Sequence, residues 1–391
     1  MLRVLTGGES HGPSLSAMVE GLPAGLEVDL DTINAELRRR QAGHGRGGRQ
    51  QIESDEAEVL TGVRFGRTLG SPVTLLVRNR DFENWRDRMA VEPSVAPPPP
   101  IEEARPGHAD FSGMLKYSTD DLRDVLERSS ARGTAMLVAV GAVCRQLLAQ
   151  IGVRVFSHVT VIGGVAVPRA EAPDYGALAE AAETSPVRMG YPDAEKDAMR
   201  AIDQAAEAGD TLGGVFEVAA LGCPPGLGSH VHWDRRLDGR LAGALMGIQA
   251  IKGVEVGMGF DVARRPGSEV HDEIVHVPGT GFRRATNNAG GVEGGMTNGE
   301  PVVVRAAMKP LSTLKRPLRS VNMRSKEAVQ AHYERSDVCA VPAAAVIGEA
   351  MVCMVLAEAV LEKFGGDSVA ELKRNHASYM AEVRRRCESP N

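Results

Sequence analysis

The spacing of hydrophobic and polar residues predicts a chain that mixes helices with strands. Apolar residues recur at helical spacing from Leu30, with Asp31 as the expected N-terminal cap and Gly43 as the end of the helix. Ser118 and Asp121 have the pattern of a capping box, which predicts a short helix after them. Longer helices are expected over residues 133–150, 175–208, 234–249 and 343–364.

Strands are expected where β-branched and other apolar residues gather between glycine and proline turns. These runs cover residues 3–5, 51–60, 153–167, 215–221, 253–260 and 301–308. Strands and helices interleave without an internal repeat, so a mixed α/β fold is expected. We expect one domain over residues 1–391, with long functional loops at 40–50, 78–110, 287–299 and 309–337 and a flexible tail from about residue 384 to residue 391.

The longest apolar stretch, 340–364, favours a buried helix over a membrane span, because Glu349 and Glu358 interrupt it and alanine dominates it. The N-terminus reaches a polar, glycine-rich motif without the apolar run of a signal peptide. The five cysteines are widely spaced and include no Cys-x-x-Cys, which favours a reducing compartment over disulfides or a zinc site. We therefore expect a cytoplasmic protein with no membrane partner.

The charge composition points to an anionic small molecule and away from nucleic acid. The net charge is −6, yet arginine outnumbers lysine 37 to 8. Guanidinium groups form bidentate bonds with phosphate and carboxylate, although codon usage in a GC-rich genome explains the excess equally well. Aromatic residues make up only 4% of the chain and no nucleic-acid-binding motif occurs, so no nucleic-acid partner is expected.

Two histidines are candidates for proton transfer. His11 and His108 both lie in glycine-flanked turns, and each has a carboxylate within two residues, Glu9 and Asp110 respectively. Histidine is the side chain best matched to proton transfer near neutral pH. A single turn histidine is more often only a hydrogen-bonded loop residue, so each carries the hypothesis weakly when it is taken alone.

Two further segments are candidates for ligand binding. At the start of an apolar helix, the segment 128–134 could gather backbone N–H groups, serine hydroxyls and guanidiniums around a phosphate, or it could simply cap the helix. The run 287–299 has five glycines in thirteen residues, which suits either close approach to a flat ligand or a surface loop. The run 43–48 matches Gly-x-Gly-x-x-Gly but follows a helix, which excludes a dinucleotide fingerprint.

No motif in the sequence indicates a metal site. His230 and His232 have strand-like spacing with only Asp234 as a nearby third ligand, so a surface pair is the favoured interpretation. The metalloprotease motif His-Glu-x-x-His and the Walker A motif are both absent from the sequence. We therefore expect no metal.

Taken together, six segments resemble the chorismate synthase family. They appear in the family's order: Gly-Glu-Ser-His-Gly (8–12), Arg-Gln-Ala-Gly-His-Gly-Arg-Gly (40–47), Arg-Pro-Gly-His-Ala-Asp (105–110), Arg-Ser-Ser-Ala-Arg-Gly-Thr-Ala (128–135), Asn-Asn-Ala-Gly-Gly-Val-Glu-Gly-Gly (287–295) and Glu-Arg-Ser-Asp (334–337). The resemblance implies a β-α-β sandwich of antiparallel sheets around a helical core. It also implies a lyase that eliminates phosphate 1,4-anti from 5-enolpyruvylshikimate 3-phosphate, giving chorismate in the last step of the shikimate pathway, with reduced FMN as cofactor.

The resemblance also implies roles for particular residues. His11 would protonate the leaving phosphate, His108 would manage the proton on the reduced flavin, and Asp337 would help flavin N5 to accept the C6 hydrogen. The implied substrate contacts are Ser10, Arg40, Arg46, Arg105, Ser130, Arg132 and Arg335. The implied FMN contacts are Arg128, Ser129, Ser130, Gln249, Ala250, Gly294, Lys309, Pro310, Leu311, Ser312, Thr313 and Arg335.

Three further expectations follow from the resemblance. Arg40 and Arg46 are candidate NADPH contacts, and an NADPH-dependent flavin reductase on the same fold is the alternative function. The family's assembly implies a homotetramer. His44 replaces the aromatic residue that commonly precedes Gly-Arg-Gly, which would place a third titrating group near Arg46.

Overall fold

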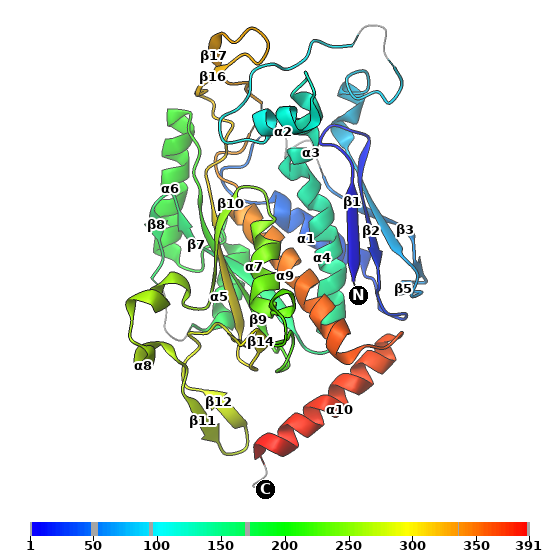
Figure 1. Cartoon of the computed structure of the whole chain (residues 1–391), viewed down its shortest axis with the longest axis vertical. Helices are drawn as coiled ribbons and strands as arrows, with labels where there is room; N and C mark the ends of the chain where they lie inside the picture. Colours follow the sequence, from blue (N-terminus) through cyan, green and yellow to red (C-terminus); the bar gives the residue numbers. More distant parts are fainter. Residues whose placement is uncertain (1, 48–53, 94–96, 169–172, 335, 389–391) are drawn as a thin grey trace.

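Two antiparallel sheets enclose a layer of helices, as the computed structural model shows for residues 2–47, 54–93, 97–168, 173–334 and 336–388 (Figure 1). The first sheet has the strand order β1-β2-β6-β3. Its strands are β1 (Arg3–Gly7), β2 (Ser14–Glu20), β3 (Ala57–Thr61) and β6 (Val73–Arg78). Every second residue of β2 and β6 is buried, so one face of the sheet packs on the helices. Strands β2 and β6 lie outside the predicted strand runs.

The second sheet has the strand order β10-β15-β9-β7-β8, and all of its pairs are antiparallel. Its strands are β7 (Arg154–Ile162), β8 (Val165–Ala166), β9 (Gly214–Leu221), β10 (Ile251–Val256) and β15 (Val302–Met308). The predicted runs 215–221 and 301–308 match β9 and β15. The predicted run 153–167 is instead a hairpin of β7 and β8 that turns at Gly163 and Gly164, and β10 ends before residue 260. Gly257 has a φ of 58°, and a Cβ there would meet the Asn288 carbonyl oxygen at 2.2 Å, so the chain must turn.

The middle layer is centred on two long apolar helices, α4 (Thr134–Ala149) and α9 (Val341–Phe364). They pack against each other; α4 also contacts β2 and β6, and α9 contacts β7 and β9. The runs 123–149 and 341–364 are long and apolar enough to cross a membrane, but 72% of each apolar stretch is buried in the protein. The predicted burial of the second run is thus confirmed.

Two helix caps differ from the predicted ones. Helix α1 (Leu30–Gln41) is capped by Asp29, whose carboxylate accepts hydrogen bonds from two backbone N–H groups of the first turn. Ser118 does not begin a helix: it has a φ of 54° and ends α2 (Asp110–Tyr117) in the left-handed conformation. The next helix, α3 (Arg123–Ser129), starts after that turn.

Three other helix predictions need correction. The expected helix 175–208 is two helices, α5 (Tyr175–Thr184) and α6 (Pro192–Ala208), because Pro186 and Gly190 interrupt it. Helix α7 (Leu237–Met246) is shorter at both ends than expected. The expected flexible tail is helical through residue 388 in α10 (Val369–Glu388), where Glu382 pairs with Arg385 and Arg386 on one helix face; residues 389–391 lie outside the described part.

The remaining elements are β4 (Val63–Arg64), β5 (Arg67–Thr68), α8 (Gly267–Val270), β11 (Ile274–Val277), β12 (Gly281–Arg284), β13 (Val292–Glu293), β14 (Met296–Thr297), β16 (Arg319–Val321) and β17 (Ala328–Gln330).

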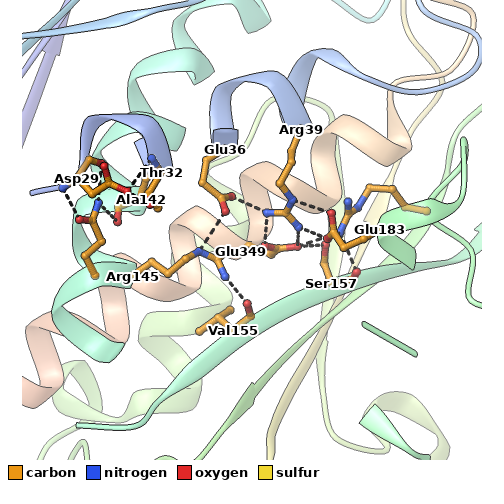
Figure 2. Close-up of polar contacts among 12 residues, drawn as sticks. Asp29, Thr32, Glu36, Arg39, Ala142, Arg145, Val155, Ser157, Glu183 and Glu349 are labelled. Carbon is orange, nitrogen blue, oxygen red and sulfur yellow. Dashed lines mark hydrogen bonds and ion pairs between the residues drawn. The ribbon is translucent and has the colours of Figure 1, made fainter. Parts of the chain in front are cut away.

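A buried ion cluster joins α1, α4, α9 and the second sheet (Figure 2). Glu349 of α9 is fully buried and accepts hydrogen bonds from Arg39 at 2.9 and 3.0 Å, from Arg188 at 3.2 Å and from Ser157 at 2.6 Å, and it also pairs with Arg145. Burial alone would raise the pKa of Glu349, but the three guanidiniums outweigh it and hold that pKa below its ordinary value. The cluster anchors the last turn of α1.

Candidate active site

A cavity of about 480 Å³, a size typical of sites for small molecules, gathers segments that lie far apart in the sequence. Five of the six family-like segments contribute to it; the exception is 287–295. The polar side chains that line it are those of Ser10, His11, Arg40, Arg46, Arg105, His108, Ser129, Ser130, Arg132, Thr134, Gln249, Lys309, Ser312, Thr313, Glu334, Ser336 and Asp337. The structure therefore brings together most of the predicted site residues.

His11 is held by a buried carboxylate from α3. Glu127 accepts one hydrogen bond from the His11 backbone N–H at 2.8 Å and lies 2.8 Å from Nδ1 of its ring. Burial opposes the charged form of Glu127, but the hydrogen bonds from His11 and Arg123 lower its pKa overall. An ionised carboxylate can only accept, so Nδ1 carries a hydrogen, and Nε2 is the ring nitrogen that can exchange a proton.

The turn that carries His11 requires glycine. Gly8 has a φ of 105°, and a Cβ there would meet the Ser14 carbonyl oxygen at 2.4 Å. Two contacts then fix the turn against α3: the Ser10 N–H donates to the Glu127 carbonyl at 3.0 Å, and the Ser10 hydroxyl donates to Ser130 at 3.1 Å. The site histidine is thus positioned by backbone contacts as well as by its ring.

His108 belongs to a second buried group. Its Nδ1 contacts the carboxylate of Asp110 at 2.5 Å, and Arg105 donates to the same carboxylate from Nε at 2.9 Å. Burial would raise the pKa of Asp110, but hydrogen bonds from His108 and Arg105 hold it well below its ordinary value. Arg105 also donates to the Thr313 hydroxyl at 3.0 Å. This group connects the expected functional loops 78–110 and 309–337.

Two of the cavity arginines share one buried carboxylate. Asp55, which is 1% exposed, accepts from Arg132 at 2.6 Å and from Arg40 at 3.3 Å. Arg40 also donates to the Thr134 hydroxyl at 2.9 Å. The pKa of Arg40 is lowered to about 10, chiefly by burial. The positive charges of Arg132 and Arg46 also lower it, whereas the carboxylate of Asp55 raises it. The guanidinium is still charged at neutral pH, so this arginine-lined wall of the cavity favours an anion.

Asp337 faces the same cavity beside Arg46. Its Oδ1 accepts from the Gly47 N–H at 2.6 Å, and its Oδ2 pairs with Arg46 at 2.8 Å. Nε of Arg46 is buried and has no hydrogen-bond partner among the described residues. The pair fixes the orientation of the carboxylate and leaves guanidinium hydrogen-bonding capacity for a ligand.

Gln249 and Ala250 form an edge of the cavity with unused polar capacity. Oε1 of Gln249 is buried without a hydrogen-bond partner among the described residues. Ala250 has a φ of 66°, a conformation that costs an alanine about 1–3 kcal/mol. Burial and the neighbouring Lys252 lower the pKa of Lys309. An unpaired amide oxygen beside a strained backbone is typical of a ligand-binding edge.

Comparison with known proteins decides the family. A family model described as chorismate synthase matches residues 2–361. The chain belongs to the chorismate synthase family. Relatives named chorismate synthase from Aquifex aeolicus (strain VF5) and Chlorobaculum tepidum (strain ATCC 49652 / DSM 12025 / NBRC 103806 / TLS) are each 54% identical to it. The first alignment covers 98% of this chain and 98% of the Aquifex protein, and the second covers 99% of this chain and 100% of the Chlorobaculum protein.

A solved structure described as "Crystal Structure of Chorismate Synthase" is 46% identical and aligns with a TM-score of 0.79 over 98% of each chain. The expected sandwich of antiparallel sheets around helices is thereby confirmed. The chain is a carbon–oxygen lyase of aromatic amino acid biosynthesis, as members of the chorismate synthase family are.

Some residues that the family resemblance assigned to FMN do not line the cavity. Arg128 donates instead to backbone carbonyls of Thr6 and Gly8 at 2.9 and 3.2 Å. Pro310 is absent from the lining although its neighbours belong to it. Gly294 lies in the β13–β14 turn, next to the N-terminal end of α7, whereas the cavity residue Gln249 follows the C-terminal end of that helix. The ten residues of α7 span about 15 Å. Arg335 lies outside the described residues.

Close backbone packing explains part of the glycine-rich run 287–299. A Cβ on Gly290 would meet the Gly257 N at 2.4 Å, and one on Gly291 would meet the Pro301 carbonyl oxygen at 2.3 Å. A Cβ on Gly294 would meet nothing within 4 Å, so packing does not account for that glycine. His44 likewise turns from the cavity, since its Nε2 contacts Asp203 of α6 at 2.7 Å.

The exposed pair of histidines has an ordinary surface partner. His232 contacts Asp234 at 2.6 Å. Within the part of the chain that the structure describes, no three histidine, cysteine, aspartate or glutamate side chains are grouped as metal ligands would be.

Three functional residues escaped the sequence analysis. Glu127 orients His11, Asp55 orients Arg40 and Arg132, and Trp85 stacks on His11 with ring centroids 3.8 Å apart. Each acts on a partner that is distant in the sequence. A local pattern carries no signal for such pairs.

Proposed function

We propose that this lyase eliminates phosphate from 5-enolpyruvylshikimate 3-phosphate in a 1,4-anti sense to give chorismate, with reduced FMN bound in the same cavity. One observation carries the proposal: two carboxylate-held histidines and four arginines, Arg40, Arg46, Arg105 and Arg132, converge on one cavity. In the reaction the C3–O bond and a C6–H bond break, a second ring double bond forms, and phosphate leaves without net oxidation.

His11 is the proposed acid for the leaving phosphate. Glu127 holds Nδ1, so Nε2 delivers the proton to the phosphate oxygen as the C–O bond breaks. General acid catalysis of this kind contributes about 10²–10⁴-fold. Glu127 also stabilises the charged imidazolium that must be reloaded before each turnover.

The arginines hold the substrate's anionic groups. Asp55 binds both Arg132 and Arg40, and both arginines line the cavity. Fixed guanidiniums bind phosphate and carboxylate with little reorganisation, and they stabilise the charge that grows on phosphate as it departs. Ser10 and Ser130 add hydroxyl groups beside them.

The edge formed by Gln249, Ala250 and the 309–313 segment fits a flavin. The buried Gln249 oxygen lacks a donor, which the N–H of a flavin ring can supply, and Lys309 and the hydroxyls of Ser312 and Thr313 suit a phosphate. Reduced FMN, when bound, would supply electron density to the departing allylic system and a basic N5 for the C6 hydrogen. His108, held through Asp110, would manage the flavin's proton, and Asp337 would assist removal of that hydrogen.

The functional molecule is proposed to be a cytoplasmic homotetramer. The hairpin of β11 and β12 projects from the lower end of the molecule in Figure 1 and carries exposed apolar side chains, including Ile274 and Phe282. Such exposed apolar surface supports assembly. Light scattering tests it: a particle of four chains is expected, and a monomer would contradict the proposal.

Two measurements test the proposed chemistry. Anaerobic incubation with 5-enolpyruvylshikimate 3-phosphate and photoreduced FMN should release phosphate and form chorismate, and no release would overturn it. Flavin fluorescence titration of Gln249→Leu should show weaker FMN binding than the parent. Gln204→Leu, at an exposed position on α6, is the matched control and should bind FMN as the parent does. Equal binding by all three would remove Gln249 from the flavin site.

A further inference from the structure

Trp85 lies face to face with the candidate acid. The ring centroids of Trp85 and His11 are 3.8 Å apart and their planes meet at 26°. Trp85 follows the 3₁₀ turn Arg80–Asn84, and its indole N–H donates to the Asp81 carboxylate at 3.1 Å. Trp85 does not line the cavity, whereas His11 does. The indole therefore covers His11 from outside the space that a substrate would occupy.

The same indole also contacts the residues that hold His11. The guanidinium carbon of Arg123 lies 4.9 Å from its centroid, and Arg123 donates to Oε1 of Glu127 at 2.8 Å. Glu127 in turn binds both the ring and the backbone N–H of His11. The side chains of His11, Trp85, Arg123 and Glu127 thus form a closed ring in which each contacts the next. His11 is left only 8% exposed.

We propose that Trp85 is a positioning residue for His11, keeping the imidazole against Glu127 and covering one of its faces so that its Nε2 proton is delivered into the cavity. The proposal rests on the acid role proposed above for His11. A rotation of the ring away from Glu127 would misdirect Nε2, and a misplacement of about 1 Å can cost on the order of 10²-fold in rate. An indole face also stabilises an imidazolium directly.

The charges around His11 come from several elements. Glu127 of α3 and Glu334 bring negative charge to this region, and Arg123 of α3 and Arg88 bring positive charge; Arg88 lies 5.4 Å from the Trp85 centroid. Burial would raise the pKa of Glu334, but His332, Arg123, Arg105 and His11 together lower it to about 2. Asp81 is engaged by the indole N–H. Protonation of His11 should therefore directly change the fluorescence of the stacked Trp85 ring.

Tryptophan fluorescence can read this contact without substrate or flavin. The chain has two tryptophans, and Trp233 is 77% exposed and near His232, so Trp233→Phe leaves Trp85 as the sole indole. A charged imidazolium quenches a stacked indole by accepting an electron from its excited state. Emission should therefore fall when the pH is lowered far enough to protonate the imidazole. His11→Gln in this background should abolish the transition, and His108→Gln should keep it.

Steady-state kinetics provides the second test. Trp85→Leu should lower kcat about 10- to 100-fold with little change in KM, because Trp85 positions the acid and does not line the cavity. Trp85→Phe keeps an aromatic face and should restore most of kcat. An effect confined to KM, or a phenylalanine variant no better than leucine, would overturn the proposal.

The fluorescence test of the contact between Trp85 and His11 depends neither on catalysis nor on the folding of Trp85→Leu. A pH transition that survives His11→Gln, or the absence of any transition in the parent with Trp85 alone, overturns the stacking role. If the protein shows no lyase activity but the His11-dependent transition is present, the proposed function fails while the contact between Trp85 and His11 stands.

Discussion

Replacing Glu349 by glutamine should destabilise the protein strongly. Glu349 is the shared acceptor for Arg39, Arg145 and Arg188, and among the described residues Glu36 and Glu183 are the further carboxylates of the cluster (Figure 2). In Glu349→Gln, three guanidiniums share two carboxylates, and the new amide donors face the arginine donors. Removing one partner from a buried ion pair costs about 3–5 kcal/mol, so the free energy of unfolding should fall by that amount.

Urea unfolding followed by circular dichroism measures this loss. The matched control is Glu382→Gln on α10, which removes an exposed carboxylate that also binds two arginines and should leave the unfolding midpoint unchanged. The pKa of Glu349 is lowered in the folded state, so its contribution is complete above the ordinary glutamate pKa of about 4.3 and is lost below it. The difference in the free energy of unfolding between parent and variant should thus narrow by up to about 1.4 kcal/mol for each pH unit below that pKa. A loss under about 1 kcal/mol at pH 7, or a gap that does not vary with pH, would refute the reasoning.

Three further predictions concern the cavity. Glu127→Gln replaces the charged acceptor of His11 Nδ1 with a neutral one, so kcat should fall about tenfold or more while KM changes little; an unchanged kcat would contradict this role. Arg40→Lys loses the fork that binds Asp55 and Thr134, so KM for the phosphorylated substrate should rise about tenfold, or about 1.4 kcal/mol, and an unchanged KM would exclude Arg40 from substrate binding. Arg40 and Arg46 line the cavity proposed for FMN and substrate and are assigned to the substrate's anionic groups, so stopped-flow mixing with NADPH should not bleach bound flavin; rapid bleaching would favour the reductase alternative.

The sheets and long helices could be predicted where residues form local periodic patterns. Helix α9 and strands β7, β9 and β15 were predicted because burial against the helix layer selects the same apolar residues that a short window detects. Strand β6 was missed because its run of six residues falls between a turn and a charged loop. Helix α10 was not predicted, and the arginines at its end suggested disorder, whereas Glu382 pairs with Arg385 and Arg386 along one helix face.

The site could be predicted only where a motif holds both partners. His108 and Asp110 are two residues apart, so a sequence pattern finds them together. His11 and Glu127 are separated by 116 positions, and only the packing of α3 beside the β1–β2 turn joins them. Gly294 belongs to a family-like motif but does not line this cavity, so its assignment to FMN stays a prediction.

Anaerobic rapid-quench measurement of phosphate release, comparing the parent with His11→Gln, tests most directly whether His11 is the acid. Both proteins would be loaded with photoreduced FMN and saturated with 5-enolpyruvylshikimate 3-phosphate. The arrangement of His11 and Glu127 predicts rapid release by the parent and a release rate about 10²–10⁴-fold lower in the variant. A parent that releases no phosphate, or a variant that releases it at the parent's rate, would contradict the assignment.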